Sequence, residues 1–338
     1  DTHCTSWATD NTNNTNNTIR VVELNARRGN HWYYINRLLK RSPKLQGVDI
    51  ILLNGMDVGL ARSSNMHTTR MLADELGMNY AWGLEYLELS NGNREERIAT
   101  GESVNMLGLH GNAILSRCPI VTGSGTIIRG NVEQELIINK EPPVPKQKLN
   151  SNSKSKSKYK LNPVLDMGVE KRLGSRMALF IKTNFGDKQL IVGSTQRLDK
   201  SVFYKVRDYL ATSQQQHDNN NKYNTYNKNN KNNENGAPNS DPNPTPTPTP
   251  TQKPIILGGS QDPELCTNLT LPIVDNINEL SYPATCYASG YITDDVICSN
   301  MNKIGDVNTG STVQPCKYNG FYKLRLSDHA FRVVDLKI

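Results

Sequence analysis

Side chains that could hold a divalent cation or a phosphate group stand in or just after several apolar stretches of this sequence. Six such stretches follow one another along the chain: Val22–Asn25, Asp49–Asp57, Gly108–Ile120, Leu190–Leu198, Pro254–Asp262 and Ser327–His329. Carboxylates are hard oxygen ligands for Mg²⁺, and Asn and His side chains can hold a phosphate and stabilise charge on it. Such groups could act together only if the fold brings the ends of these stretches to one place.

In this order, the six stretches resemble those of the endonuclease/exonuclease/phosphatase superfamily, which includes DNase I-like nucleases and neutral sphingomyelinases. Gly108–Ile120 is close to the family's GNAILSRxPI stretch, and Ser327–His329 matches its terminal Ser-Asp-His. Six ordered motifs are more specific than any one of them. The resemblance covers residues 19–338 apart from two insertions. It implies a four-layer α/β sandwich whose site lies at strand ends on one rim.

The resemblance also implies a Mg²⁺-dependent hydrolytic site, in which an Asp activates water while His and Asn side chains hold the phosphate. Three positions keep the family's residues: Asn25, Asp328 and His329. Four positions depart from the family. Gly55 replaces the metal-binding Glu, Gln196 the phosphate-contacting His, Ser260 the water-activating Asp, and Asp262 an Asn.

These departures predict a pseudoenzyme, because groups of a catalytic set act as a unit and losing one commonly lowers the rate by orders of magnitude. The remaining candidate metal ligands are Asp328 and Asp262, which together would hold Mg²⁺ weakly. Asp262 lies two residues after Ser260 and on the same side of an extended chain, so a carboxylate is still present near the position where the family has its water-activating Asp. For Asp57, which matches a second acidic position of the family, we expect another role.

We therefore predict a binding or interaction protein that needs no cofactor and has a ligand or protein partner of unknown identity. The alternative is an atypical Mg²⁺-dependent phosphodiesterase, acting on nucleic acid or on a phospholipid headgroup through a rearranged site. The resemblance places His110 and Asn112 near the substrate rim, as candidate substrate-binding residues. A structural role is the simpler alternative for a lone His before a Gly.

Hydrophobic periodicity predicts the elements that must position these residues. Strands are expected over residues 19–24, 48–53, 79–89, 111–115, 177–182 and 189–195. Helices are expected over residues 31–41, 65–76 and 203–210. Strands and helices mixed in this way are typical of an α/β sandwich.

Residues 1–18 are predicted to form a flexible leader, followed by one domain over 19–338. Low-complexity insertions interrupt it at about 143–163, which is Lys/Ser-rich, and at about 212–253, which is Asn-rich with a Pro-Thr repeat. Six lysines and no acidic residue lie between Pro142 and Leu165, and they supply nearly all of the net charge of +7. This segment is either a solvated loop or a polybasic arm for anionic surfaces. The near-neutral remainder does not support nucleic-acid binding, although such binding stays possible.

Several features favour secretion. The chain begins with Asp1 rather than Met, which predicts a removed signal peptide. Six cysteines without Cys-x-x-Cys spacing favour disulfides, with Cys4 reaching Cys118 and the four C-terminal cysteines pairing mainly among themselves. Acceptor triplets for N-glycosylation begin at Asn13, Asn16 and Asn268. No apolar run approaches the roughly 18 residues of a transmembrane helix.

Overall fold

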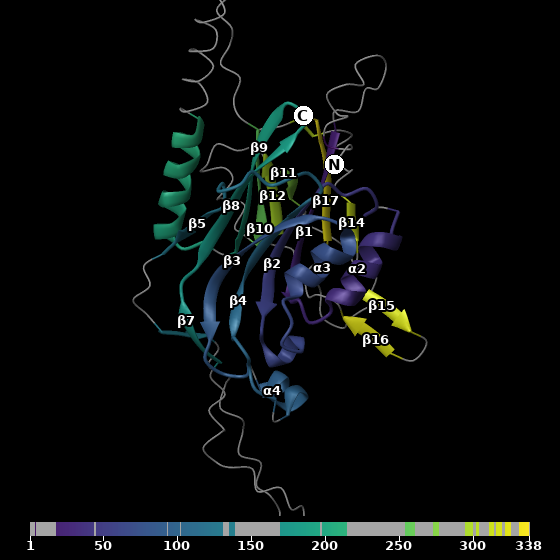
Figure 1. The fold of residues 1–338 in the computed structure, drawn as a ribbon, viewed down its shortest axis with the longest axis vertical. Coiled ribbons are helices and arrows are strands. Elements are labelled where there is room, and N and C mark those ends of the chain that lie inside the picture. Colours follow the sequence, from purple (N-terminus) through teal and green to yellow (C-terminus); the bar gives the residue numbers. More distant parts are fainter. Residues whose placement is uncertain are drawn as a thin grey trace, which may run out of the picture.

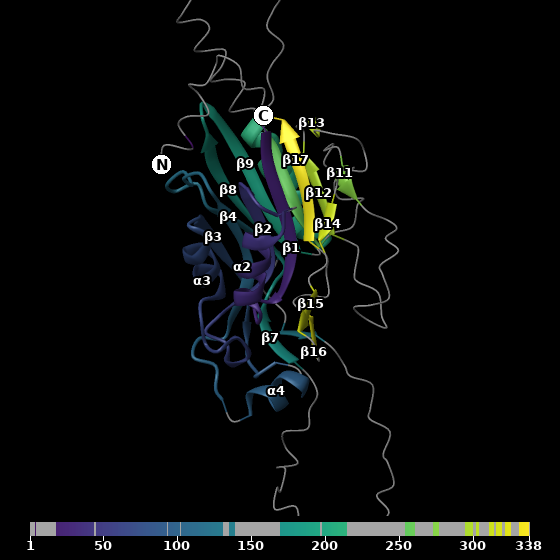
Figure 2. The same cartoon turned by 90° about the vertical axis from the view of Figure 1, so that its right-hand side faces the viewer.

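The computed structural model describes part of the chain, mostly in long segments up to residue 214 and in short strands after residue 253. The described residues are 4, 18–43, 45–92, 94–101, 103–130, 135–138, 170–196, 198–214, 254–260, 273–276, 295–299, 302–303, 311–313, 316–319, 322–325 and 331–337. They form two mixed β-sheets packed face to face, with helices on the outer faces (Figures 1 and 2). The predicted four-layer α/β sandwich is confirmed.

The first sheet has nine strands in the order β13-β17-β1-β2-β4-β3-β7-β6, with β14 also paired to β17. Its strands are β1 (Thr18–Arg28), β2 (Ile50–Val58), β3 (Asn79–Glu88), β4 (Leu109–Ser116), β6 (Glu135–Ile138), β7 (Glu170–Gly174), β13 (Asn302–Lys303), β14 (Ser311–Val313) and β17 (Phe331–Lys337). Strands β1 and β2 are parallel neighbours at its centre.

The second sheet has six strands in the order β11-β12-β10-β9-β8-β5. They are β5 (Thr126–Arg129), β8 (Met177–Phe185), β9 (Lys188–Gln196), β10 (Ile255–Ser260), β11 (Ile273–Asn276) and β12 (Asp295–Ser299). Here β9 and β10 are the parallel pair. Strands β15 (Cys316–Asn319) and β16 (Tyr322–Arg325) form a separate ribbon.

Apolar clusters fill the spaces between the layers, because alternate residues of each strand point to opposite faces. Leu52 of β2 and Val192 of β9 belong to the cluster between the two sheets. The outer face of the first sheet packs on α2 (Trp32–Arg41) and α3 (Thr68–Leu76). The outer face of the second packs on the helical residues 200–214, which Asp199 caps through a hydrogen bond to the Val202 amide.

The predicted elements are confirmed, with shifted ends. The strand predicted over 48–53 runs on to Val58, and the helix predicted over 65–76 begins at Thr68, where the His67 ring accepts a hydrogen bond from the Arg70 amide. The helix predicted over 203–210 extends through residue 214. The rest of that insertion, the first insertion and most of the leader lie outside the described residues.

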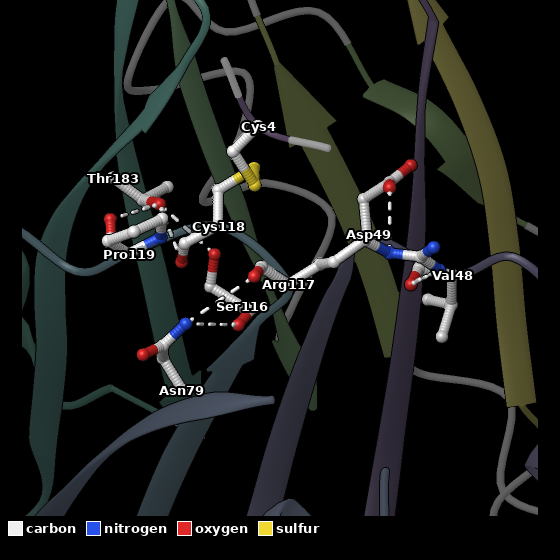
Figure 3. Close-up of a disulfide and its surroundings, with 9 residues drawn as sticks. All are labelled: Cys4, Val48, Asp49, Asn79, Ser116, Arg117, Cys118, Pro119 and Thr183. Atoms are coloured by element: carbon white, nitrogen blue, oxygen red, sulfur yellow. Dashed lines mark hydrogen bonds and ion pairs between the residues drawn. A yellow bond between two sulfur atoms is a disulfide. The ribbon is translucent and has the colours of Figure 1, made fainter. Parts of the chain in front are cut away.

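A disulfide joins Cys4 to Cys118, as predicted from the sequence (Figure 3). Both sulfurs lie in the cluster between the sheets, and the Thr183 hydroxyl beside them is 3.0 Å from the carbonyl oxygen of Pro119. The bond therefore fastens the start of the chain to the turn that follows β4 (Leu109–Ser116). The side chains of the four C-terminal cysteines lie outside the described residues, so their pairing stays a prediction.

Candidate functional site

The space between the two sheets changes from apolar to polar toward the carboxyl ends of β1, β2, β9 and β10. On β2, Ile50 and Leu52 belong to the apolar cluster, and Asn54 continues the same face. The Asn54 side chain crosses to β9, donating to the carbonyl oxygen of Thr195 at 2.9 Å and to the Ser194 hydroxyl at 3.2 Å. These contacts hold the ends of β2 and β9 together and define the rim that the motifs predict.

Gly55 lies on this rim in a backbone conformation that few other residues adopt. Its φ is +71°, and the pairing of β2 with both β1 and β4 shifts register around it. A Cβ atom at this position would lie 3.3 Å from Oδ1 of Asn25 and 3.6 Å from Cε1 of His110. Gly55, Asn25 and His110 are therefore neighbours, and a Cβ atom at position 55 would require Oδ1 of Asn25 to shift by a few tenths of an ångström.

Gln196 and Ser260 meet on the opposite sheet, as paired residues at the ends of β9 and β10. The Oε1 atom of Gln196 is buried and has no hydrogen-bond partner within the described part of the chain. The same holds for Oδ1 of Asn112, whose amide nitrogen lies 3.4 Å from the Met177 sulfur. The predicted residues Asp262, Asp328 and His329 lie outside the described residues.

Asp57 and His110 form a buried pair beside Gly55, held by Arg62. Arg62 follows β2 in the short 3-10 helix η1 (Ala61–Ser63), and its guanidinium donates to both carboxylate oxygens of Asp57, at 2.7 and 3.0 Å. Nδ1 of His110 lies 2.6 Å from Oδ1 of Asp57. Asp57 thus forms an ion pair with Arg62 and a hydrogen bond with His110, which is a role other than binding a metal.

Burial and charge fix the protonation of this pair. For Asp57, burial favours the neutral form, but the charge of Arg62 and hydrogen bonds from His110 and Arg62 outweigh it and lower the pKa of the carboxyl. Burial lowers the pKa of His110 to about 4, against the opposing effect of Asp57. At neutral pH, a neutral His110 therefore donates its Nδ1 proton to an ionised Asp57.

Further charged groups extend the pair into a buried network that the sequence analysis did not identify. Arg172 of β7 donates to Glu88 at 3.1 Å and lies 4.1 Å from the centre of the Tyr86 ring. The Tyr86 ring also stacks with the His110 ring, at a centroid distance of 4.5 Å. Arg62 also reaches Glu88, at 3.3 Å. Glu85 and Glu88, in a strand that is otherwise mostly apolar, were the available signal of buried carboxylates needing cationic partners.

The described residues do not fit the divalent cation that the family resemblance implies. Gly55 offers no ligand where the family has a Glu, and both oxygens of Asp57 are engaged by Arg62 and His110. No three His, Cys, Asp or Glu side chains gather in a metal-binding arrangement within the described segments. We therefore derive no reaction step through a cation here.

We expect stability to fall as the pH falls from about 6.5 to about 4, and His110 to cause much of the decrease. The unfolded state binds a proton on this His near pH 6.5, whereas the folded state does so only near pH 4. The unfolded state thus binds more protons in this window, which lowers the free energy of unfolding by up to about 3 kcal/mol. Asp57, with its lowered pKa, loses its contribution only at lower pH.

Urea unfolding at several pH values, for the wild type and His110→Gln, measures this effect. The variant should show a flatter pH dependence over the window, because it lacks the buried histidine. The slope that remains comes in part from His31 and His67, whose pKa values are also lowered and which both proteins contain. Equal slopes for the two proteins would contradict a neutral, buried His110.

Comparison with known proteins gives similar folds at low sequence identity. No protein-family profile and no curated protein sequence matches the chain. An endonuclease/exonuclease/phosphatase family protein from Leptotrichia buccalis C-1013-b is 11% identical, with a TM-score of 0.46 over 95% of this chain and 100% of that one. The endonuclease/exonuclease/phosphatase from Bacteroides vulgatus is 10% identical, with a TM-score of 0.45 over 95% and 99%.

The human Nocturnin catalytic domain is 13% identical, with a TM-score of 0.44 over 94% of this chain and 93% of that one. At these identities and TM-scores the matches carry no conclusion about the site of this chain. The ordered motifs of the sequence and the two packed mixed sheets, each with a central parallel pair, are observations of this chain itself. The chain has an α/β sandwich fold, with two packed mixed sheets and helices on their outer faces.

Proposed function

We propose that this protein is a secreted binding or interaction protein built on the endonuclease/exonuclease/phosphatase fold, with little or no phosphodiesterase activity. The observation that carries the proposal is the packing around Gly55. A side chain there would meet Asn25 and His110 at its first carbon, and the φ of +71° disfavours any residue other than glycine. The backbone at this position thus favours the glycine that stands where the resemblance implies a Glu.

The neighbouring groups support the same proposal. A family site needs a group that takes a proton from water and groups that stabilise charge on the phosphate. Gln196 can hydrogen-bond but cannot carry a proton, and Ser260 is a poor base. His110 is neutral at pH 7 and directs its Nδ1 proton to Asp57. Gln196 and Ser260 are therefore suited to holding structure or a ligand, and His110, with a pKa of about 4, is a weak proton acceptor.

Secretion is supported by the Cys4–Cys118 disulfide, because such bonds persist in oxidising compartments. The acceptor triplets at Asn13, Asn16 and Asn268 agree with that environment. Within the described part of the chain, no helix has the length and apolar content that crossing a membrane requires.

The ligand that suits this rim best is neutral or cationic. Asp262 and Asp328, in the motifs that follow β10 and precede β17, would repel a phosphodiester unless a cation stood between them. Gln196 and Asn112 offer buried acceptor atoms that have no hydrogen-bond partner among the described residues. A ligand carrying hydrogen-bond donors would satisfy such atoms.

Hydrolysis assays test the proposal directly. We expect no turnover of bis-p-nitrophenyl phosphate, DNA or sphingomyelin above the blank with Mg²⁺ or Mn²⁺. Adding Mg²⁺ at 1 mM should stabilise the fold by less than about 0.1 kcal/mol if its dissociation constant exceeds about 10 mM. Thermal unfolding with and without Mg²⁺, Mn²⁺ and Ca²⁺ measures this.

The control pair is Asp328→Ala and Asp187→Ala, the second at an exposed turn residue. Neither should change the response to metal. Metal-dependent turnover that Asp328→Ala abolishes and Asp187→Ala leaves intact would refute the proposal. It would establish the alternative, an atypical Mg²⁺-dependent phosphodiesterase.

A further inference from the structure

A pocket of about 400 Å³ is lined by residues of α4 (Arg94–Thr100), of η1 (Ala61–Ser63) and of the turn that follows β1 (Thr18–Arg28). This volume lies in the range of about 300–1,000 Å³ that is usual for small-molecule sites. None of the rim residues Asn25, Gly55 and Gln196 lines it. We call it the side pocket, and its polar walls include Asn30, Arg62, Ser64, Glu96, Thr100 and Ser103.

The charged side chains around the side pocket pair with one another in equal numbers. The Glu96 carboxylate in its wall pairs with both Arg28 and Arg62. Three arginines and three carboxylates form the whole network, which consists of Arg28, Arg62, Arg172, Asp57, Glu88 and Glu96. The described part of this network therefore carries no net charge. An ion entering the pocket would lose hydration without meeting an unpaired counter-charge from it, so a neutral ligand is favoured.

Several hydrogen-bonding groups in the walls remain for a ligand. Oδ1 of Asn30 has no hydrogen-bond partner among the described residues, so a turn of the amide can present either its donor or its acceptor to the pocket. The Thr100 hydroxyl donates to the carbonyl oxygen four residues earlier at 2.9 Å, which leaves its lone pairs to accept. Ser64 and Ser103 are exposed and add two more hydroxyls to the lining. These groups match a ligand whose own groups both donate and accept.

Backbone strain coincides with the side pocket. The non-glycine residues with positive φ in the described part of the chain lie in two turns. Arg27 and Arg28, at 45° and 68°, precede Asn30 of the pocket, while Ser64 and Asn65, at 58° and 56°, belong to its wall. Residues with a side chain rarely adopt this conformation, and it is concentrated at functional sites.

Hydrogen bonds hold these walls in place before any ligand arrives. The Asn65 side chain accepts from the Met106 amide at 3.0 Å and donates to the carbonyl oxygen of Val104 at 3.1 Å. The carbonyl oxygen of Ser103 accepts from the Asn91 side chain at 2.7 Å. A site whose backbone is already fixed loses less entropy when a ligand binds.

We propose that the side pocket binds a neutral polyhydroxylated molecule of the size of one sugar residue. The hydroxyls of such a ligand exchange hydrogen bonds with Asn30, Thr100 and the two serines, and Ala61 and Ala99 offer small apolar surface to its C–H groups. The proposal goes beyond the function proposed for the rim. Hydrolysis at the rim would leave this site standing, and a failure to bind sugars would leave the proposed function of the rim standing.

Saturation-transfer NMR titrations of the full chain test the proposal with glucose, galactose, mannose and N-acetylglucosamine. At least one of these neutral sugars should bind with a dissociation constant of about 10 mM or lower. Glucosamine and glucose 6-phosphate add a positive and a negative charge to the same ring. The best neutral sugar should bind at least about threefold more tightly than either of them.

Two variants, each with a matched control, assign the binding to the side pocket. Ala99→Trp places a large ring in the pocket wall and should weaken binding by about tenfold or more, whereas Ala211→Trp, at another exposed helical alanine, should bind as the wild type does. Asn30→Ala should weaken binding by about fivefold, and Asn184→Ala, at an exposed asparagine of β8, should not.

Circular dichroism confirms that each variant is folded. Three results would overturn the proposal. They are no binding of the four neutral sugars at 50 mM, unchanged binding by Ala99→Trp, and tighter binding of glucosamine or glucose 6-phosphate than of every neutral sugar.

Discussion

Replacing Arg62 by Met should lower the free energy of unfolding by about 3–5 kcal/mol, because it leaves a buried carboxylate without its cation. The Arg62 side chain is 2% exposed and Asp57 is fully buried. The guanidinium provides two of the hydrogen bonds to Asp57 and one to Glu88. After the substitution, His110 is the remaining side-chain donor to Asp57 within the described residues, and at neutral pH it carries no charge.

Urea unfolding measures this effect, and two further variants assign its cause. Arg207→Met removes a cation from an ion pair whose side chains are 52 and 69% exposed, and should change stability by less than about 0.5 kcal/mol. Adding Asp57→Asn to Arg62→Met removes the unpaired charge and should recover more than about 1 kcal/mol. A loss below 1 kcal/mol for Arg62→Met alone would mean that the network is not buried as described.

Restoring the family's acid by Gly55→Glu is expected to destabilise the protein by about 4 kcal/mol and to restore no hydrolysis. The backbone at φ +71° strains any L-residue by about 1–2 kcal/mol. The Cβ atom of the new side chain would also lie 3.3 Å from Oδ1 of Asn25, and its carboxylate would begin from a buried position, where an unpaired charge is costly.

Gly123 provides a matched control, because its φ is +72° and nothing lies within 4 Å of a Cβ placed there. Gly123→Glu should therefore lower the free energy of unfolding only by the backbone strain of about 1–2 kcal/mol. The difference between the free energies of unfolding of the two variants separates backbone strain from the cost of crowding and burying a charge. Hydrolysis is measured for both variants in the presence of Mg²⁺. A Gly55→Glu protein that is as stable as the wild type and cleaves bis-p-nitrophenyl phosphate would show that one substitution had removed the activity, and would contradict the proposed function.

Much of the frame could be predicted from the sequence because buried strands and amphipathic helices leave clear periodic signals. The strand at 19–24, the helix at 31–41 and the pair at 177–195 are examples, and all are present. The ends of the elements are harder to predict from the sequence. Polar residues such as Asn54 and Asp57 continue a strand when other parts of the fold supply their hydrogen-bond partners.

The partners themselves could not be predicted. Nothing in the local sequence indicates that Asp57 would bind Arg62 five residues later and His110 fifty-three residues later, because the contacts depend on the turn after β2 and on the register with β4. The helix α4 (Arg94–Thr100) was missed for a related reason. Its seven residues carry four charges and a single large apolar residue, and that residue points to solvent.

The pairing of Thr18 with Lys337 has a practical consequence for handling the protein. These residues lie at the far ends of β1 and β17 from the rim, about 30 Å away for a strand of this length (Figure 1). A tag appended after β17 would therefore emerge on the side opposite Gly55. Immobilisation on a sensor chip through that tag would leave the rim facing the flow, which is the orientation that ligand screening requires.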